Sequence, residues 1–256
     1  MTFSLRKFLL TSAVAATVVL PAAAGPAAAF DAAQRKEIES IVRDYLLANP
    51  EVMLEVQDAL EAKQTAAQRD QQKDAITAQS TKIFDNATDP VLGNPDGTAT
   101  VVEFFDYNCG YCRRALSDMV SMMENDSELK FVLKEFPILG PDSVAAHRVA
   151  FAFNDLYPDK YTAFHLRLLG FDGRADEDVA IRIAKELGAD EDALRAKMAD
   201  ASVTQRIQAT YKLANDLGIN GTPAYVIGDE VISGALGEDV LATKVANVRA
   251  CGSTVC

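Results

Sequence analysis

The chain contains 256 residues, of which 37 are acidic and 25 are basic, so its formal net charge at pH 7 is −12. Binding to nucleic acid needs a basic surface that neutralises phosphate groups. The acidic balance therefore excludes a nucleic-acid partner and mainly favours solubility.

The first 29 residues have the pattern of an export signal. A basic start at Arg6 precedes an apolar run of 13 residues, 8–20, which is too short to span a membrane. Small residues ending at Ala29 fit a cleavage site. We expect residues 1–29 to be a signal peptide cleaved near Ala29, and the mature chain to reach the periplasm, where disulfides persist. An uncleaved anchor helix is the alternative.

The next segment, residues 30–83, is rich in alanine and polar residues. Apolar residues recur at helical spacing over 38–46, Asn49-Pro50 interrupts the pattern, and a second stripe follows over 52–60. Two helices of this length cannot bury a core by themselves. The stripe must pack on the main domain or on other copies of the chain. We expect self-association, through residues 30–63.

Turn-forming residues over 84–97 mark the start of the main domain, which we place at 84–250. The apolar run 98–105 is typical of a buried strand, and residues 129–136 form the next one. A helical pattern between the two runs predicts that the strands are parallel.

A Cys-x-x-Cys motif follows the first of these strands and opens that helical pattern. Cys109 and Cys112 flank Gly110-Tyr111. A thiolate at a helix N-terminus lies against unpaired N–H groups and the positive end of the helix dipole, and Arg113-Arg114 adds positive charge. We therefore expect Cys109 to be the nucleophile and Cys112, one turn later, the resolving thiol.

A zinc site is the first alternative for these cysteines. Zinc would need two further ligands at close spacing, but the other two cysteines, Cys251 and Cys256, lie far along the chain. The two histidines are also far apart. His165 lies on an apolar stripe and is expected in the core, whereas His147 lies beside its stripe and is expected at the surface. A purely structural disulfide in the motif is the second alternative.

The tail, residues 251–256, holds the remaining two cysteines. In an oxidising compartment two spare cysteines this close are expected to pair with each other. We predict a Cys251–Cys256 disulfide, against the alternative of two free thiols on a frayed end.

Glu103 is an acid inside the otherwise apolar run that precedes the motif. One interpretation places its side chain on a solvated strand face. The other makes it a buried acid that relays protons to the cysteines, which a central strand makes plausible.

Four apolar stripes at helical spacing lie between residues 142 and 218, and they predict a helical insertion. Thr222-Pro223 then opens a last strand, where proline cannot donate to a central ladder. We predict a cis bond there, close to Cys109. A hairpin turn at 228–230 and a final helix over 236–248 complete the domain.

The strand before Cys109, the motif at a helix start, the helical block and the Thr222-Pro223 hairpin together resemble the thioredoxin fold, in its DsbA-like branch. The run 102–109 is close to that branch's strand. The run 43–52 resembles the amino-terminal domain of the ScsC-like copper-tolerance proteins. The resemblance implies an α/β thioredoxin fold with a helical insertion, preceded by an amino-terminal helical oligomerisation segment.

The resemblance also implies thiol–disulfide exchange on exported proteins, with no cofactor beyond the redox-active disulfide of the motif. The roles it implies are nucleophile for Cys109, resolving thiol for Cys112, redox tuning for Gly110 and Tyr111, substrate binding for Thr222 and Pro223, and buried acid for Glu103. It further implies cysteine-containing client proteins, a membrane thiol reductant or oxidant, and a homo-oligomer, with a trimer favoured over a dimer.

Two departures bear on the direction of exchange. The dipeptide lacks the histidine of the strongly oxidising members, and Thr222 rather than valine precedes the proline, which favours a disulfide isomerase or reductase over a dithiol oxidase. Cu(I) binding by Cys109 and Cys112, as soft thiolate ligands, is another alternative. An adaptor with an inactive site is the last, and the presence of both cysteines argues against it.

Overall fold

A computed structural model describes residues 30–256, so the expected signal peptide lies outside the described residues. The described chain divides into two compact units, with the division between Leu60 and Glu61. Within residues 30–256, no helix combines the length and the apolar character that a membrane crossing needs.

The first unit contains α1 (Ala32–Ala48) and the start of α2 (Glu51–Ala78). Asp31 caps α1: its side chain accepts hydrogen bonds from the N–H groups of Ala33 and Gln34, and Oε1 of Gln34 accepts a hydrogen bond from the N–H of Asp31. No residue of α1 is buried. The exposed large apolar side chains of these two helices are Ile38, Ile41, Val42, Tyr45, Leu47, Met53, Leu54, Val56 and Leu60.

In the second unit, α2 continues as helix through residues 64–74. Its last turns, with the short helix α3 (Ser80–Phe84), place Ile76 and Ile83 in an apolar core beside the sheet. The division at residue 60 therefore precedes the boundary expected near 83, because the end of α2 packs with the main domain.

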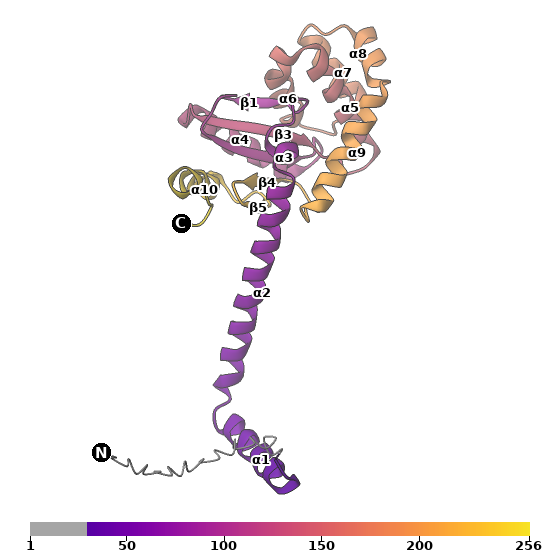
Figure 1. Ribbon diagram of the computed structural model, residues 1–256. Helices are drawn as coiled ribbons and strands as arrows, with labels where there is room; N and C mark the ends of the chain where they lie inside the picture. The colour runs from indigo at the N-terminus through magenta and orange to yellow at the C-terminus, as the bar shows by residue number, and fades with distance from the viewer. Residues whose placement is uncertain (1–29) are drawn as a thin grey trace, which may run out of the picture. The chain divides into compact units, whose positions relative to one another are not determined.

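The second unit is built on a five-stranded sheet in the order β1-β3-β2-β4-β5 (Figure 1). The strands are β1 (Val91–Gly93), β2 (Ala99–Phe105), β3 (Leu129–Glu135), β4 (Ala224–Ile227) and β5 (Glu230–Ser233). Strands β2 and β3 are parallel, as predicted, and the other three pairs are antiparallel. This is the mixed sheet of a thioredoxin fold.

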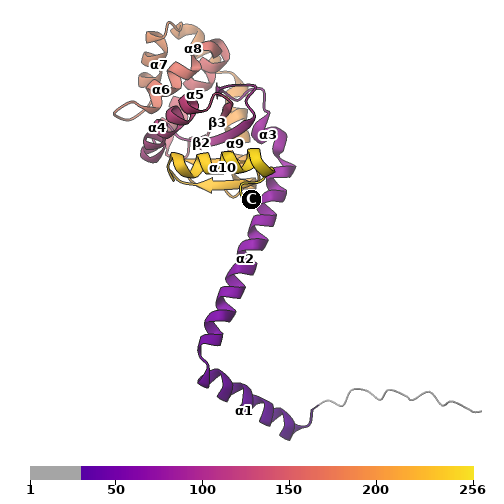
Figure 2. The same cartoon turned by 90° about the vertical axis from the view of Figure 1, so that its left-hand side faces the viewer.

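Alternate residues of β2 enter two different cores. Val101 and Phe105 pack in the larger cluster with α4 (Gly110–Asn125) and α10 (Glu238–Cys251), whereas Val102 and Phe104 pack in the second cluster with α3 and the end of α9. Helix α10, in the foreground of Figure 2, contacts β2 and β4 on the first of these faces. Because both faces of the strand are covered, its sequence is a continuous apolar run and does not alternate.

The predicted helical insertion consists of five α-helices and one 3-10 turn. They are α5 (Pro141–Leu156), η1 (Pro158–Lys160), α6 (Tyr161–Leu169), α7 (Glu177–Glu186), α8 (Glu191–Met198) and α9 (Ala201–Asp216). The expectation for His147 is wrong: its side chain in α5 is fully buried. Helix α5 contacts α6, α7, α8 and α9, so residues well beside its apolar stripe are also covered. His165 is buried, as expected.

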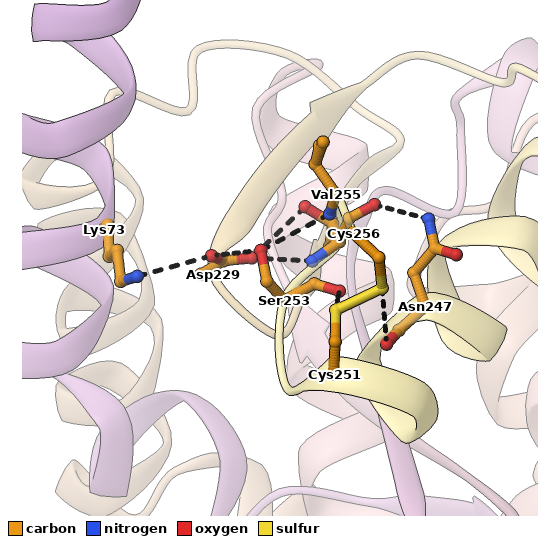
Figure 3. The surroundings of a disulfide bond; sticks show 8 residues. Lys73, Asp229, Asn247, Cys251, Ser253, Val255 and Cys256 are labelled. Carbon is orange, nitrogen blue, oxygen red and sulfur yellow. Dashed lines mark hydrogen bonds and ion pairs between the residues drawn. A yellow bond between two sulfur atoms is a disulfide. The ribbon is translucent and has the colours of Figure 1, made fainter.

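Cys251 and Cys256 form a disulfide at the end of α10, as the sequence predicts (Figure 3). The tail between them is bound to the turn that joins β4 and β5. The N–H of Thr254 and the hydroxyl of Ser253 both donate to the Asp229 carboxylate, at 2.9 and 2.8 Å. Lys73 of α2 lies 3.8 Å from the same carboxylate.

Candidate functional site

The Cys-x-x-Cys motif lies where β2 ends and α4 begins. Asp106 organises the turn between them: its Oδ1 accepts the N–H of Asn108 at 2.8 Å, and its backbone carbonyl accepts the N–H of Cys109 at 2.9 Å. The second carboxylate oxygen accepts the N–H of Leu139 at 2.9 Å. Cys109 is thereby held as the N-cap residue of α4.

The surroundings of Cys109 favour its thiolate. Hydrogen bonds from the Cys112 side chain, and further ones from the Thr222 side chain and the backbone N–H groups of Cys112 and Tyr111, outweigh burial and lower the pKa of Cys109 to about 5. The helix N-terminus therefore acts as predicted. Arg113 donates to the carbonyls of Leu169 and Gly173, and the Arg114 guanidinium lies 4.3 Å above the Tyr111 ring, so the positive charge expected from the two arginines is held by these other contacts.

Cys112 has the opposite character. Its side chain is fully buried, and burial, together with the hydrogen bond to Cys109, raises its pKa well above the ordinary value. Both cysteines are free thiols. The motif thus combines one thiol that ionises readily with one that keeps its proton, which is the asymmetry needed for attack followed by resolution.

Glu103 is buried, with 2% of its surface exposed, so the interpretation as a solvated strand residue is wrong. Burial and then the negative charge of Cys109 raise the pKa of Glu103 to about 8. The carboxyl in turn raises the pKa of Cys112. A buried acid with this pKa can hold or release a proton near neutral pH.

The Thr222-Pro223 bond is cis, and it lies beside the nucleophile, as predicted. The Cys109 thiol donates to the carbonyl of Thr222 across 3.2 Å. A groove runs alongside; it is lined by Tyr111, Asn220, Gly221, Thr222, Pro223, Ser233, Gly234, Ala235 and Leu236. Tyr111 is 59% exposed at this groove, whereas Gly110 opens the helix and has nothing within 4 Å of where a Cβ would be.

The residues that the structure describes contain no group of three or more histidine, cysteine or acidic side chains arranged to hold a metal ion. A soft ion such as Cu(I) would have the sulfurs of Cys109 and Cys112 as its ligands. The tail disulfide occupies the other two cysteines.

Sequence reasoning missed a polar cluster behind the motif. Glu135, at the end of β3, lies 2.9 Å from Nδ1 of His147 and accepts the Tyr161 hydroxyl at 2.7 Å. An available signal was Glu135 itself, which, like Glu103, is an acid within an apolar strand pattern. Its partners come from the insertion, and no local spacing connects them to it.

Comparison with known proteins gives two family matches. The DSBA-like thioredoxin domain matches residues 100–246, and the copper resistance protein ScsC N-terminal domain matches residues 34–67. The thiol:disulfide interchange protein DsbA of Bordetella parapertussis is 29% identical over 60% of this chain and 75% of that protein.

Two solved structures are similar along most of their length. A thioredoxin-like oxidoreductase from Silicibacter pomeroyi DSS-3 is 41% identical, with a TM-score of 0.64, over 67% of this chain and 98% of that one. A linker-deletion variant of ScsC from Proteus mirabilis is 29% identical, with a TM-score of 0.65, over 88% of this chain and 99% of that one. Because the DSBA-like match spans more than half of the sequence, the chain belongs to the family of DsbA-like thioredoxin-domain proteins, which are thiol:disulfide oxidoreductases, and it carries an amino-terminal domain of the ScsC type.

Proposed function

We propose that this protein exchanges disulfides in exported client proteins in the periplasm, chiefly as a disulfide isomerase and reductase. The observation that carries the proposal is the asymmetry of the motif: Cys109 has a pKa of about 5, while Cys112, one turn later, keeps its proton. The leader-like residues 1–29 and the Cys251–Cys256 disulfide support an oxidising compartment.

The reaction begins when the Cys109 thiolate attacks one sulfur of a client disulfide. A mixed disulfide forms, and the other client sulfur leaves as a thiolate that takes a proton from solvent. In isomerisation, a different client thiolate then attacks the mixed disulfide, which creates a new client disulfide and returns Cys109 as thiolate.

In reduction, Cys112 attacks Sγ of Cys109 instead. In the mixed disulfide Cys109 carries no charge, so one of the two causes that raise the pKa of Glu103 is removed, and Glu103 in its ionised form can accept the proton that Cys112 loses. The client then leaves with both cysteines reduced. The motif is then oxidised. A membrane thiol reductant must supply two electrons to return it to the dithiol form.

The groove beside Cys109 fits an extended client segment. Thr222 and Pro223 form the wall nearest the nucleophile, so we assign them to binding the client backbone. Tyr111 and Gly110 lie between the two thiols in sequence, and we assign them to tuning the stability of the motif's disulfide.

Self-association through residues 30–63 completes the proposal. Helix α1 buries none of its residues, and large apolar side chains of α1 and early α2 are exposed. An exposed apolar face of this kind marks an association surface. A symmetric trimer would bury it. Several Cys109 sites on one assembly would raise the effective concentration of attacking thiolates around a held client.

The test compares recovery of activity from a scrambled-disulfide substrate with the mass of the protein in solution. The proposal expects a trimer that restores the substrate, a Cys109→Ser variant that does not, and a chain lacking residues 30–63 that is monomeric and isomerises poorly. A monomeric full-length mature protein would contradict the assembly. A trimer whose Cys109→Ser variant restores the substrate equally well would contradict the chemistry.

A dithiol oxidase is a second candidate, favoured by one observation. A Cys109 pKa of about 5 stabilises the reduced motif and so makes its disulfide a better oxidant. The discriminating measurement is the rate at which the oxidised protein forms disulfides in a reduced client. Faster oxidation than isomerisation would reverse the assignment.

Copper binding is a third candidate, favoured by the match to the ScsC copper resistance domain. A Cu(I) titration of the reduced protein and of the Cys109→Ser, Cys112→Ser variant tests it. Tight binding of one ion that is lost in the variant would support it, whereas equal weak binding by both proteins would exclude it.

A further inference from the structure

A cluster of buried polar side chains lies behind the turn that carries Cys109, and the exchange reaction proposed above does not use it. The cluster joins the turn, β3, α5 and α6, and none of its members is more than 2% exposed. Its members are Tyr107, Glu135, His147, Tyr161 and His165. Most buried polar groups are hydrogen-bonded, so the pattern of those bonds shows what the cluster holds in place.

The hydrogen bonds of His147 determine where its proton is. The backbone N–H of Tyr107 donates to Nε2 across 3.3 Å, so Nε2 carries no proton. The proton of the neutral ring is then on Nδ1, which donates to Oε2 of Glu135 at 2.9 Å. The Tyr161 hydroxyl donates to the other oxygen at 2.7 Å. Glu135 accepts on both oxygens, as an ionised carboxylate does.

The bond to Tyr107 matters because of where this peptide group lies. Three successive N–H groups lead into the nucleophile. The N–H groups of Asn108 and Cys109 are both accepted by Asp106, within the turn. The N–H of Tyr107 is accepted by His147, so it ties the turn to α5 in the insertion.

We propose that His147, oriented by Glu135, is a positioning residue for Cys109. By holding the peptide N–H of Tyr107 it fixes the turn that directs Sγ of Cys109 toward the N-terminus of α4. The inference rests on the proposed exchange at Cys109, and it applies equally to oxidation, reduction and isomerisation.

If residue 147 served only to fill space in the core, it would not need to accept a hydrogen bond. The His147 ring contacts the Tyr107 and Phe105 rings, with centroids 4.6 and 5.3 Å apart. An apolar side chain could fill that space, but it would leave the buried N–H of Tyr107 without an acceptor. The substitution His147→Leu removes the acceptor, whereas His147→Gln keeps an acceptor oxygen at the distance of Nε2.

His165 offers a matched control within the same cluster. Its ring is also fully buried and packs on Phe105, with centroids 4.8 Å apart. Its Nδ1 lies 3.4 Å from the Tyr107 hydroxyl, and its Nε2 has no hydrogen-bond partner among residues 30–256. The substitution His165→Leu therefore removes a buried imidazole of the same size without touching a peptide group of the turn.

The measurement is the pH profile of Cys109 alkylation in the reduced protein, alongside the thermal midpoint of each variant. We expect His147→Leu to raise the pKa of Cys109, and a rise of about one unit would cut its thiolate fraction at pH 5 about fivefold. His147→Gln should restore most of the wild-type profile. His165→Leu should lower the thermal midpoint and leave the profile unchanged. A wild-type profile in His147→Leu, or an equal shift in His165→Leu, overturns the proposal.

A second measurement needs no substitution. In the wild-type protein labelled with 15N, the proposal expects a coupling across the hydrogen bond between the Tyr107 amide nitrogen and Nε2 of His147, and a proton on Nδ1. A proton on Nε2 overturns it, whether or not His147→Leu folds. Failure of the exchange proposal looks different: wild-type Cys109 would keep this alkylation profile and yet fail to exchange client disulfides.

Discussion

The backbone N–H of Cys112 donates to Sγ of Cys109 across 3.4 Å, so the peptide group of the second cysteine stabilises the thiolate of the first. The Cys112 side chain is itself buried, and burial raises its pKa. Cys112 therefore favours ionisation of Cys109, while its own burial keeps the Cys112 thiol protonated.

This relationship predicts selective alkylation. At pH 6, Cys109 is mainly thiolate and Cys112 is almost entirely thiol, so Cys109 should react with iodoacetamide faster by a factor on the order of 100 or more. A time course of peptide masses from the reduced protein measures both rates. Similar rates at the two cysteines would contradict the assignment of Cys109 as nucleophile.

Glu103 should make stability depend on pH. Its folded pKa of about 8 lies above the ordinary 4.5, so between these values the folded protein holds a proton that the unfolded chain releases. The free energy of unfolding should therefore fall as pH rises through this window, by several kcal/mol at most, and Glu103→Gln should remove most of that fall.

The test of Glu103 is best made on the oxidised protein, in which Cys109 carries no charge, so that burial, the larger cause, alone raises the pKa of Glu103. Urea unfolding at a series of pH values gives the free energy for wild type and for Glu103→Gln. Parallel profiles for the two proteins would show that Glu103 is already ionised in the folded state.

The buried pair Lys134 and Asp89 should be sensitive to loss of one partner. Burial lowers the pKa of Lys134 and Asp89 partly restores it, so Asp89→Leu leaves an uncompensated charge and should cost about 3 to 5 kcal/mol of unfolding free energy. The exposed pair of Arg182 and Glu186 is the control, since Glu186→Gln should cost less than about 1 kcal/mol.

Denaturant unfolding of these variants, together with the double substitution Asp89→Leu, Lys134→Met, completes the comparison. The double variant should recover much of the loss, because it buries no lone charge. A double variant less stable than Asp89→Leu alone would contradict the prediction, because it would show that the lone buried charge of Lys134 is not the main cost.

Removal of the tail disulfide should have a modest effect on stability. Cys251 and Cys256 are five positions apart, and closing so short a loop accounts for about 2 kcal/mol in the chain-entropy description. Unfolding of the Cys251→Ser, Cys256→Ser variant measures this, with its alkylation at Cys109 as a control. Peptide mapping without reduction that found Cys251 linked to Cys109 would contradict the pairing.

Local sequence patterns were enough to predict the strand, the Cys-x-x-Cys and the helix, since each depends on residues close together in the chain. The burial of Glu103 could not be decided from them, because it depends on which helices cover each face of β2. His147 was misplaced for the same reason. A stripe of helical spacing shows one buried face of α5, but not that four other helices enclose it.

The amino-terminal boundary shows a related limit. Composition changes near residue 83, where glycine and turn formers begin, and the sequence boundary was drawn there. Ile76 and Ile83 nevertheless lie in the core of the second unit. Two apolar side chains in a polar helix give too weak a pattern to indicate which partner they pack against.

The contact between Cys109 and Thr222 joins residues 113 positions apart. Because a chain is synthesised from its amino terminus, the Cys-x-x-Cys motif is made well before the segment that forms the groove wall. During that interval the cysteines have no built surface for a client. The wall beside Cys109 is therefore complete only when synthesis of the chain is nearly finished, so a newly made motif exists for a time without it.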